Sequence, residues 1–181
     1  MCKLEKQIQM TDNKNFFGSL DNVTLKPYDP NYPLIFEKEI ELLKQTLPNR
    51  KASYYHIGST AIPEILSKPI VDIAIEIEEF PLTEQEIIKI SECGYRYWDS
   101  NPNADHQFFF KNLPRTHHLH FYPQEYQKMI DQIRFRDILN TDKKLRAEYE
   151  DLKIQLAEKH KNDREKYTDE KAIFVKKVLE Q

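Results

Sequence analysis

Glycine, cysteine and tryptophan are scarce in this sequence, which has only three, two and one of them among 181 residues. The two cysteines, Cys2 and Cys93, cannot build a disulfide framework, and they lack the CxxC spacing of a metal site. No apolar run approaches the length of a membrane span, and the opening MCKLEKQIQM lacks the apolar core of a signal peptide. We therefore expect a cytoplasmic protein of a reducing compartment, with no membrane partner.

A strong excess of one charge is also missing, because 27 basic residues stand against 30 acidic ones, for a net charge of −3. This balance provides no general attraction for nucleic acid, and no basic stripe interleaved with aromatics appears, so we do not expect a nucleic-acid partner. Ten Phe and ten Tyr supply large apolar surfaces. A chain of this length has enough of them for the core of one domain.

The chain changes character twice along its length. Residues 1–20 are polar and weakly patterned, and we expect a loosely attached N-terminal arm there. A single domain then covers 21–181, with a sheet core over about 21–122 and a helical cap over about 123–181. Strand patterns occupy 23–28, 52–58, 68–77, 95–98, 107–111 and 116–122, and helical patterns occupy 29–48, 83–94, 125–140, 142–160 and 169–181. The predicted fold is α/β or α+β, a mixed sheet flanked by helices.

Residues that commonly precede helices mark several of the predicted helix starts. Asp29 is expected to cap the first helix, and Thr83 with Glu86 forms the pattern of a capping box. Thr141 and Thr168 are expected to cap the last two helices.

Strand alternation sorts the residues of 68–77 into a core face and an acidic face. Side chains alternate along a strand, so Asp72 and Glu76 share one face with Ala74, and the isoleucines take the other. The acidic face is expected to meet water, a cleft or a cation, because an unpaired buried carboxylate is costly.

A second strand, THHLHFY, places His118 and His120 on one face and His117 on the other. Histidines at i and i+2 on a strand have Cα atoms about 7 Å apart and can converge on one ligand. The pair predicts either a metal or catalytic site with Asp72, or two histidines that only hydrogen-bond on a polar sheet face.

A turn of small residues, Gly58, Ser59 and Thr60, comes between two predicted strands. Glycine lets a backbone approach a phosphate closely, and the hydroxyl residues can donate hydrogen bonds to it. An ordinary strand connection is the competing interpretation. Lys68, Arg115 and Arg136 are candidates for neutralising a phosphate, although Lys68 fits a solvated lysine and Arg136 fits an ion pair with Asp137.

Four segments in order, HIGSTAIPEILSKPIVDI, RTHHLHFY, FRDIL and YEDLKIQLAEKHKNDREKYTDEKAIF, resemble the GrpB family, a branch of the nucleotidyltransferase-like superfamily. The resemblance covers about residues 23–178. It implies a nucleotidyltransferase-like mixed sheet flanked by helices, with the superfamily's Gly-Ser turn at Gly58 and Ser59 and its first strand carboxylate at Asp72.

The sequence departs from the superfamily pattern where a second carboxylate is expected two residues after the first. That position holds Ala74. Glu76 lies four residues, or about 13 Å, along the strand from Asp72, too far to replace the missing carboxylate in one compact site. Glu64 also stands where relatives more often have glycine.

Two hypotheses follow from the residues and the resemblance. In the first, the protein binds a nucleotide or another phosphorylated small molecule and transfers a nucleotidyl or phosphate group. Asp72, His118 and His120 are then the catalytic residues, and with Glu76 they are the candidate ligands of a divalent metal (Mg, Mn or Zn). In the second, the protein is a non-catalytic ligand-binding module or an accessory module with a protein partner, which has kept the fold but lost the catalytic carboxylates.

Overall fold

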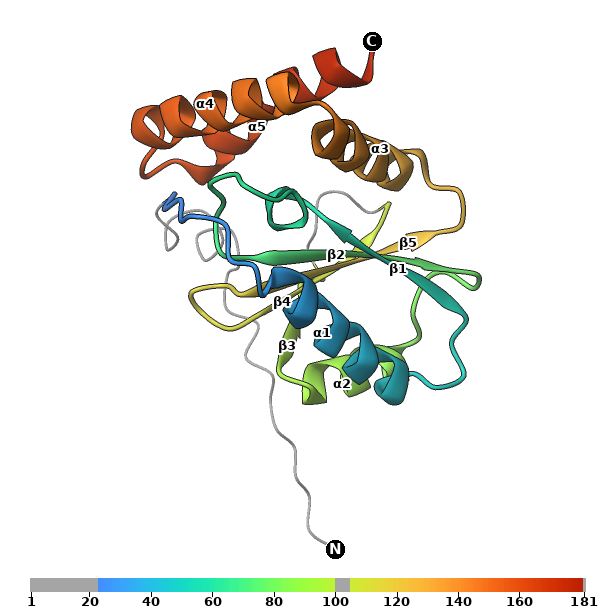
Figure 1. Ribbon diagram of the computed structural model, residues 1–181. Helices are drawn as coiled ribbons and strands as arrows, with labels where there is room; N and C mark the ends of the chain where they lie inside the picture. Colours follow the sequence, from blue (N-terminus) through green and yellow to red (C-terminus); the bar gives the residue numbers. More distant parts are fainter. Residues whose placement is uncertain (1–22, 100–104, 181) are drawn as a thin grey trace, which may run out of the picture.

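The computed structural model describes residues 23–99 and 105–180, and the expected arm over 1–20 lies outside them. A mixed sheet crosses the middle of the described chain, in the strand order β1-β2-β5-β4-β3 (Figure 1). β2 and β5 run parallel, and the other neighbouring pairs are antiparallel. The strands are β1 (Ala52–Ile57), β2 (Val71–Ile77), β3 (Tyr95–Tyr97), β4 (Gln107–Lys111) and β5 (His117–Pro123).

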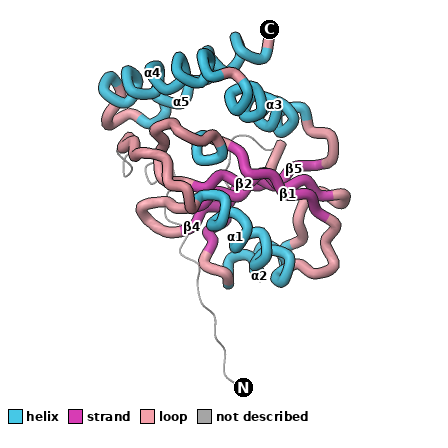
Figure 2. Tube along the Cα trace, in the orientation of Figure 1, coloured by secondary structure: helices cyan, strands magenta, loops and turns pink. Residues whose placement is uncertain are grey.

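Helices cover both faces of this sheet (Figures 1 and 2). α1 (Tyr32–Thr46) and α2 (Glu84–Glu92) lie on one face, whereas α3 (Gln127–Thr141), α4 (Lys143–Lys159) and α5 (Arg164–Leu179) form a layer on the other. The predicted class, a mixed sheet flanked by helices with a helical C-terminal segment, is therefore confirmed.

The strand alternation assigns each face of β2 as the sequence predicts. Ile73, Ile75 and Ile77 are fully buried in the core that α1 and α2 cover. Ala74 points to the opposite face, where it packs with Tyr122 and Met129 beneath α3. Because β5 follows β2 in parallel register, the polar sides of both strands also face the α3–α5 layer.

The predicted neighbourhood of residues 69–77 and 115–122 is confirmed by the pairing of β2 with β5. The predicted strand over 23–28 is wrong, since the structure has only an isolated bridge between Lys26 and Ser67. Pro27 follows directly and has no N–H to donate to a longer ladder.

Helix α2 begins as predicted, with the capping box of Thr83 and Glu86 fully formed. Three other predicted caps are wrong. Asp29 accepts a hydrogen bond from the Asn31 amide at 2.8 Å in a turn before α1, so the helix begins only at Tyr32.

The last two helices begin after aspartates and not after the predicted threonines. Asp142 accepts from the Lys144 and Leu145 amides and caps α4, while Thr141 donates back into α3. Asp163 caps α5, which starts five residues before the predicted helix, and Thr168 lies inside it. Aspartate and threonine are both good caps, so the choice depended on where the preceding helix ended.

Candidate functional site

Asp72, His118 and His120 meet on the sheet face that looks toward the α3–α5 layer. The parallel register places Asp72 directly beside His118, and His120 lies two residues further along β5. His118 Nδ1 is 2.7 Å from Asp72 Oδ1, and His120 Nε2 is 3.8 Å from the same oxygen. One candidate ligand atom from each residue lies within 4.8 Å of the other two. The structure thus brings the three residues of the predicted catalytic set into one cluster, which we call the Asp-His-His cluster.

Gly58 closes over the Asp72 carboxylate. Its φ of +72° is a backbone conformation that residues with a side chain rarely adopt. A Cβ atom built on Gly58 would lie 2.5 Å from Asp72 Oδ2. Only glycine allows the turn to approach this closely. The Gly-Ser turn and the strand carboxylate of the sequence motif are therefore in direct contact.

Burial raises the pKa of Asp72, but hydrogen bonds from His118 and His120 and their positive charge outweigh it. The net result holds the pKa of this carboxyl well below its usual range. Asp72 is therefore an anion at neutral pH, able to bind a cation or to orient an imidazole.

A further histidine, His106, joins the cluster from the residue before β4. Its Nε2 lies 3.4 Å from His120 Nδ1, and Asp105 Oδ1 lies 3.1 Å from its Nδ1. Asp105 in turn accepts a hydrogen bond from the Tyr126 hydroxyl. Burial lowers the pKa of His106 to about 4, although Asp105 acts in the opposite direction, so the ring is neutral at pH 7.

His106 is not among the site residues predicted from the sequence. A signal was present, because extending the alternation of QFFFK back by one residue places His106 on the same face as Phe108 and Phe110. β4 pairs with β5 so that Phe108 is opposite His120, and the Phe108 ring centroid lies 4.9 Å from that of His120. Phe108 and Tyr122 thereby flank the histidines with aromatic surface.

The hydroxyl residues of the turn have different environments. Thr60 is 1% exposed, and its Oγ1 donates to the Ile70 carbonyl at 3.0 Å and contacts His56 Nε2 at 3.0 Å. Thr60 therefore holds the turn in place. Ser59 is half-buried, with its Oγ 3.5 Å from the Tyr149 hydroxyl.

The three predicted phosphate-binding cations lie in separate places. Lys68 has its ammonium 4.9 Å from the centre of the Tyr167 ring. The buried Arg115 lies over the Phe110 ring, at 4.7 Å. Arg136 of α3 donates to the His56 carbonyl at 2.7 Å and to Asp137 at 2.8 Å, so it joins α3 to β1.

Among the described residues, Glu76 is not part of the Asp-His-His cluster. Its Oε1 instead accepts a hydrogen bond from the Glu125 amide at 2.9 Å. Ala74, at the position of the expected second carboxylate, is fully buried. A pair of magnesium ions, which prefer oxygen ligands, does not fit this set of donors. One carboxylate and two imidazoles fit a single transition-metal ion such as zinc or manganese, with coordination positions left over for a ligand.

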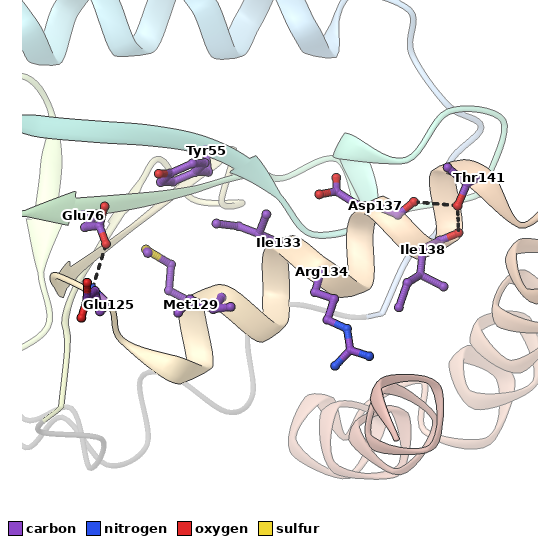
Figure 3. A pocket seen from close by; sticks show the side chains of 10 residues that line it. Tyr55, Glu76, Glu125, Met129, Ile133, Arg134, Asp137, Ile138 and Thr141 are labelled. Atoms are coloured by element: carbon purple, nitrogen blue, oxygen red, sulfur yellow. Dashed lines mark hydrogen bonds between the residues drawn. The ribbon is translucent and has the colours of Figure 1, made fainter. Parts of the chain in front are cut away.

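An open groove of about 640 Å³ lies between α3 and β1, and Glu76 is one of the residues that line it (Figure 3). Its walls are mainly apolar, and Met129 and Ile133 of α3 point toward Tyr55 of β1 (Figure 3). None of the residues that line this groove belongs to the Asp-His-His cluster.

Comparison with known proteins gives a consistent match. The family model described as GrpB protein matches residues 22–181. The glutamate-rich protein GrpB of Alkalihalophilus pseudofirmus is 35% identical over 164 residues, which cover 87% of this chain and 94% of that protein. A UPF0157 protein of Pseudomonas aeruginosa is 32% identical over 164 residues, covering 88% of this chain and 67% of that one.

A solved structure resembles the whole described fold. The crystal structure of the conserved protein GrpB from Enterococcus faecalis superposes with a TM-score of 0.78 at 28% identity, covering 87% of this chain and 98% of that one. A shorter match, 29% identical over 76 residues, is to a dephospho-CoA kinase of Mycolicibacterium paratuberculosis, and it covers 40% of this chain and 19% of that protein. Among the described residues, no helix is long and apolar enough to cross a membrane.

Proposed function

This chain belongs to the GrpB family, and from that premise we propose that it binds a nucleotide or another phosphorylated small molecule at the Asp-His-His cluster. The observation that carries the proposal is the convergence of three candidate ligand atoms within 4.8 Å of one another. They lie beside Gly58, whose missing side chain allows the turn to approach Asp72 closely. Such a site supports nucleotidyl or phosphate-group transfer, the reaction class that the resemblance to nucleotidyltransferases implies.

Asp72, His118 and His120 would hold one divalent transition metal ion. When bound, such an ion supplies Lewis-acid stabilisation of charge on a phosphoryl oxygen. The protein itself supplies the fixed anion of Asp72, which the depressed pKa keeps charged, and the turn at Gly58, which rests against this carboxylate.

As the alternative to holding a metal, His120 is placed to move a proton. Its two ring nitrogens face Asp72 on one side and His106 on the other, and Asp105 orients His106 in turn. An imidazole held between two partners has a fixed tautomer and orientation, which a general acid or base requires. Phe108 and Tyr122 limit the access of water to the same ring.

A second candidate function is supported by Ala74. Since a buried alanine stands where a second carboxylate is expected, the site would bind its phosphorylated ligand without transferring a group. A similar segment within a protein named dephospho-CoA kinase agrees with an accessory role beside an enzyme. In this case metal and ligand bind, but incubation with nucleotides yields no product.

The test is calorimetry of zinc, manganese and magnesium binding to the wild type, to His120→Ala and to Glu76→Gln. We expect zinc or manganese to bind the wild type, and His120→Ala to weaken binding by at least about 100-fold, because even outer-shell partners of ligating histidines contribute about 10–100-fold. Binding should also weaken as pH falls, since imidazole must be neutral to coordinate.

Glu76→Gln is the matched control, because it lies on the same strand face outside the cluster and keeps an acceptor for the Glu125 amide. It should leave metal affinity unchanged. Equal and negligible metal binding by all three proteins would instead leave the histidines as hydrogen-bonding residues of a polar sheet face.

A further inference from the structure

β1 forms one edge of the sheet, with α1 on one face of it and α3 on the other (Figure 1). In β2, the Val71 amide donates to the Thr116 carbonyl beside β5, at 2.9 Å. Successive residues of a strand direct their main-chain groups to opposite sides, so every second residue of β2 bonds to β5 and the residues between them bond to β1. The register of β1 and β2 then directs the main chain of three β1 residues away from the sheet: Ala52, Tyr54 and His56.

Two of these three residues keep their outward groups unpaired. Arg136 of α3 donates to the His56 carbonyl at 2.7 Å, in agreement with the direction assigned to it. Within the part of the chain that the structure describes, no hydrogen bond is made to the outward N–H and C=O groups of Ala52 and Tyr54. Both residues are only half-buried. An edge of this kind is a template for a further strand.

β1 also lacks the features that protect an edge strand from pairing, which are proline, charged side chains and very short length. Its six residues, ASYYHI, include no proline and no Asp, Glu, Lys or Arg. Burial lowers the pKa of His56 to about 4, so this ring is neutral at pH 7. The opposite edge, β3, has three residues, and Arg96 is the middle one. Only the edge at β1 is therefore suited to pairing.

The groove between α3 and β1 lies beside this edge. Met129 of α3 packs with Ala74 of β2, and Tyr122 of β5 donates a hydrogen bond to Gln132 at 3.2 Å. α3 therefore sits above the inner strands, and the groove runs along its outer flank above Tyr55 (Figure 3). If the sheet continued past β1, a second helix could lie beside α3, because neighbouring helices are about 8–10 Å apart, twice the strand spacing.

The outer flank of α3 combines apolar side chains with unmatched charges. It is a stripe of residues three or four positions apart, which includes Ile130, Ile133 and Arg134. Ile130 is 40% exposed. Within the described ranges, the Arg134 guanidinium and the Glu125 carboxylate have no ion-pair partner. Opposite charges on the two sides of an apolar centre make this surface complementary to a second copy of itself, turned by a two-fold axis.

α3 runs in the same direction as β1, which fixes what such an axis would bring together. At one end, Glu76 lies opposite Ser53 in the sheet and accepts the Glu125 amide just before α3. At the other end, Arg136 donates to the His56 carbonyl. The strand from Ser53 to His56 is about 10 Å long, which equals about seven residues of helix, so Ser53 lies level with the first turn of α3.

We propose that β1 pairs with β1 of a second copy of this chain, in antiparallel register about a two-fold axis at Ser53, so that the two copies share one continuous sheet. Ala52 of each copy exchanges both main-chain hydrogen bonds with Tyr54 of the other. The inference is independent of the proposed function, since neither β1 nor the outer flank of α3 contributes a residue to the Asp-His-His cluster.

The same axis places the two α3 helices antiparallel on one sheet face. Ile130, in the first turn, meets its counterpart near the axis. Arg134 lies four residues after Ile130 and Glu125 lies five before it, so each Arg134 faces Glu125 of the other copy. The groove of each copy is covered, and both unpaired charges gain a partner.

The test measures molecular mass by light scattering and sedimentation over a range of protein concentrations. We expect the wild type to form a dimer of twice 21.7 kDa. Ile130→Lys places like charges near the axis and should weaken dimerisation by at least about tenfold. Ile173→Lys is the matched control, because Ile173 is 71% exposed on α5 and does not line the groove, and it should remain dimeric.

A charge exchange tests the register. Arg134→Glu should weaken dimerisation by about tenfold, and the double variant Arg134→Glu/Glu125→Arg should restore it, because the two charges then face each other in reverse. Hydrogen exchange tests the edge itself, since the Ala52 and Tyr54 amides should exchange slowly in the dimeric wild type and rapidly in Ile130→Lys.

Three results would overturn the inference. A wild type that stays monomeric at every concentration would leave the edge of β1 to a strand from another protein. A dimer that persists unchanged in the folded Ile130→Lys variant would lie at a different surface. A double charge variant that dimerises no better than Arg134→Glu would contradict the proposed register.

Discussion

Gly58 is the residue on which the geometry of the candidate site depends most directly. Its missing side chain allows the turn before β2 to rest on Asp72, and its positive φ turns the chain from β1 into the short 3-10 helix Ser59–Ala61. In a sequence with only three glycines, a glycine placed here supports the interpretation that the close approach is needed.

Replacing Gly58 with alanine should destabilise the fold by about 2–4 kcal/mol, because the strain of a positive φ is joined by a clash with Asp72. Gly94→Ala is the matched control, since it also has a positive φ, of +88°, but its Cβ would meet only Lys111 Cε, at 3.7 Å. It should cost about 1 kcal/mol. Denaturant unfolding compares the two variants, and equal losses would show that the clash is relieved without cost.

At the scale of single elements, α2 shows how a capping residue can also join neighbouring segments. Glu86 completes the capping box with Thr83 and accepts a hydrogen bond from Arg50 Nε at 2.8 Å. Arg50 also donates to the Glu79 carbonyl at 2.7 Å. The start of α2 is thereby tied to the segments on either side of the β1–β2 hairpin.

The pKa of Glu86 predicts how this element responds to acid. The hydrogen bond from Arg50, together with hydrogen bonds from Thr83, outweighs the opposing effect of burial and lowers the pKa to about 2. A depressed carboxyl pKa stabilises the fold above the unfolded-state value of 4.5, and this stability is lost as pH falls toward 2. We expect about 2–3 kcal/mol of pH-dependent stability from this residue.

Glu86→Gln should lack that contribution. Urea unfolding of both proteins at several pH values between 6 and 2 measures this contribution. The difference in the free energy of unfolding between wild type and variant should become smaller as pH falls. A gap that stays constant across this range would mean that Glu86 is not preferentially ionised in the folded state.

For the whole molecule, two cationic side chains attach the α3–α5 layer to the sheet and its loops. Arg136 joins α3 to β1, and Lys153 joins α4 to the loop before β2. Phe135, Tyr149 and Phe174 pack together within the layer.

The buried Lys153 predicts an alkaline gain in global stability. Its pKa is about 7 in the folded state and 10.5 in the unfolded chain, so between these values the unfolded chain binds more protons. Stability from this residue should therefore rise as pH increases from about 7 to 10. Lys153→Met should not show this rise, and it should be at least as stable as the wild type below pH 7, where the buried charge is costly.

Thermal unfolding of both proteins between pH 6 and pH 10, without phosphate in the buffer, tests this prediction. Each protein gives a curve of unfolding temperature against pH, and the difference between the two curves isolates the effect of Lys153 from that of the tyrosines, which titrate at higher pH. Parallel curves would contradict it, because they would mean that the ammonium is not desolvated in the folded protein.

The sequence by itself determined much of the local order of this protein. Period-two alternation placed Asp72 on one face of its strand and the isoleucines on the other, and it paired His118 with His120. The capping box of Thr83 and Glu86 and the change from strand to helical pattern after about 122 were also predictable. These features depend on neighbours within a few residues, whose side-chain directions the backbone period sets.

Only the tertiary structure decided what these faces meet. The parallel register of β2 and β5 brought Asp72 to His118, and the pairing of β4 with β5 added His106. The packing of α4 against the loop before β2 brought Lys153 to the Leu66 carbonyl. Such contacts join residues separated by dozens of positions, and they depend on which elements pack together. Local propensity carries no information about that choice, because the same alternating strand can pair with several partners.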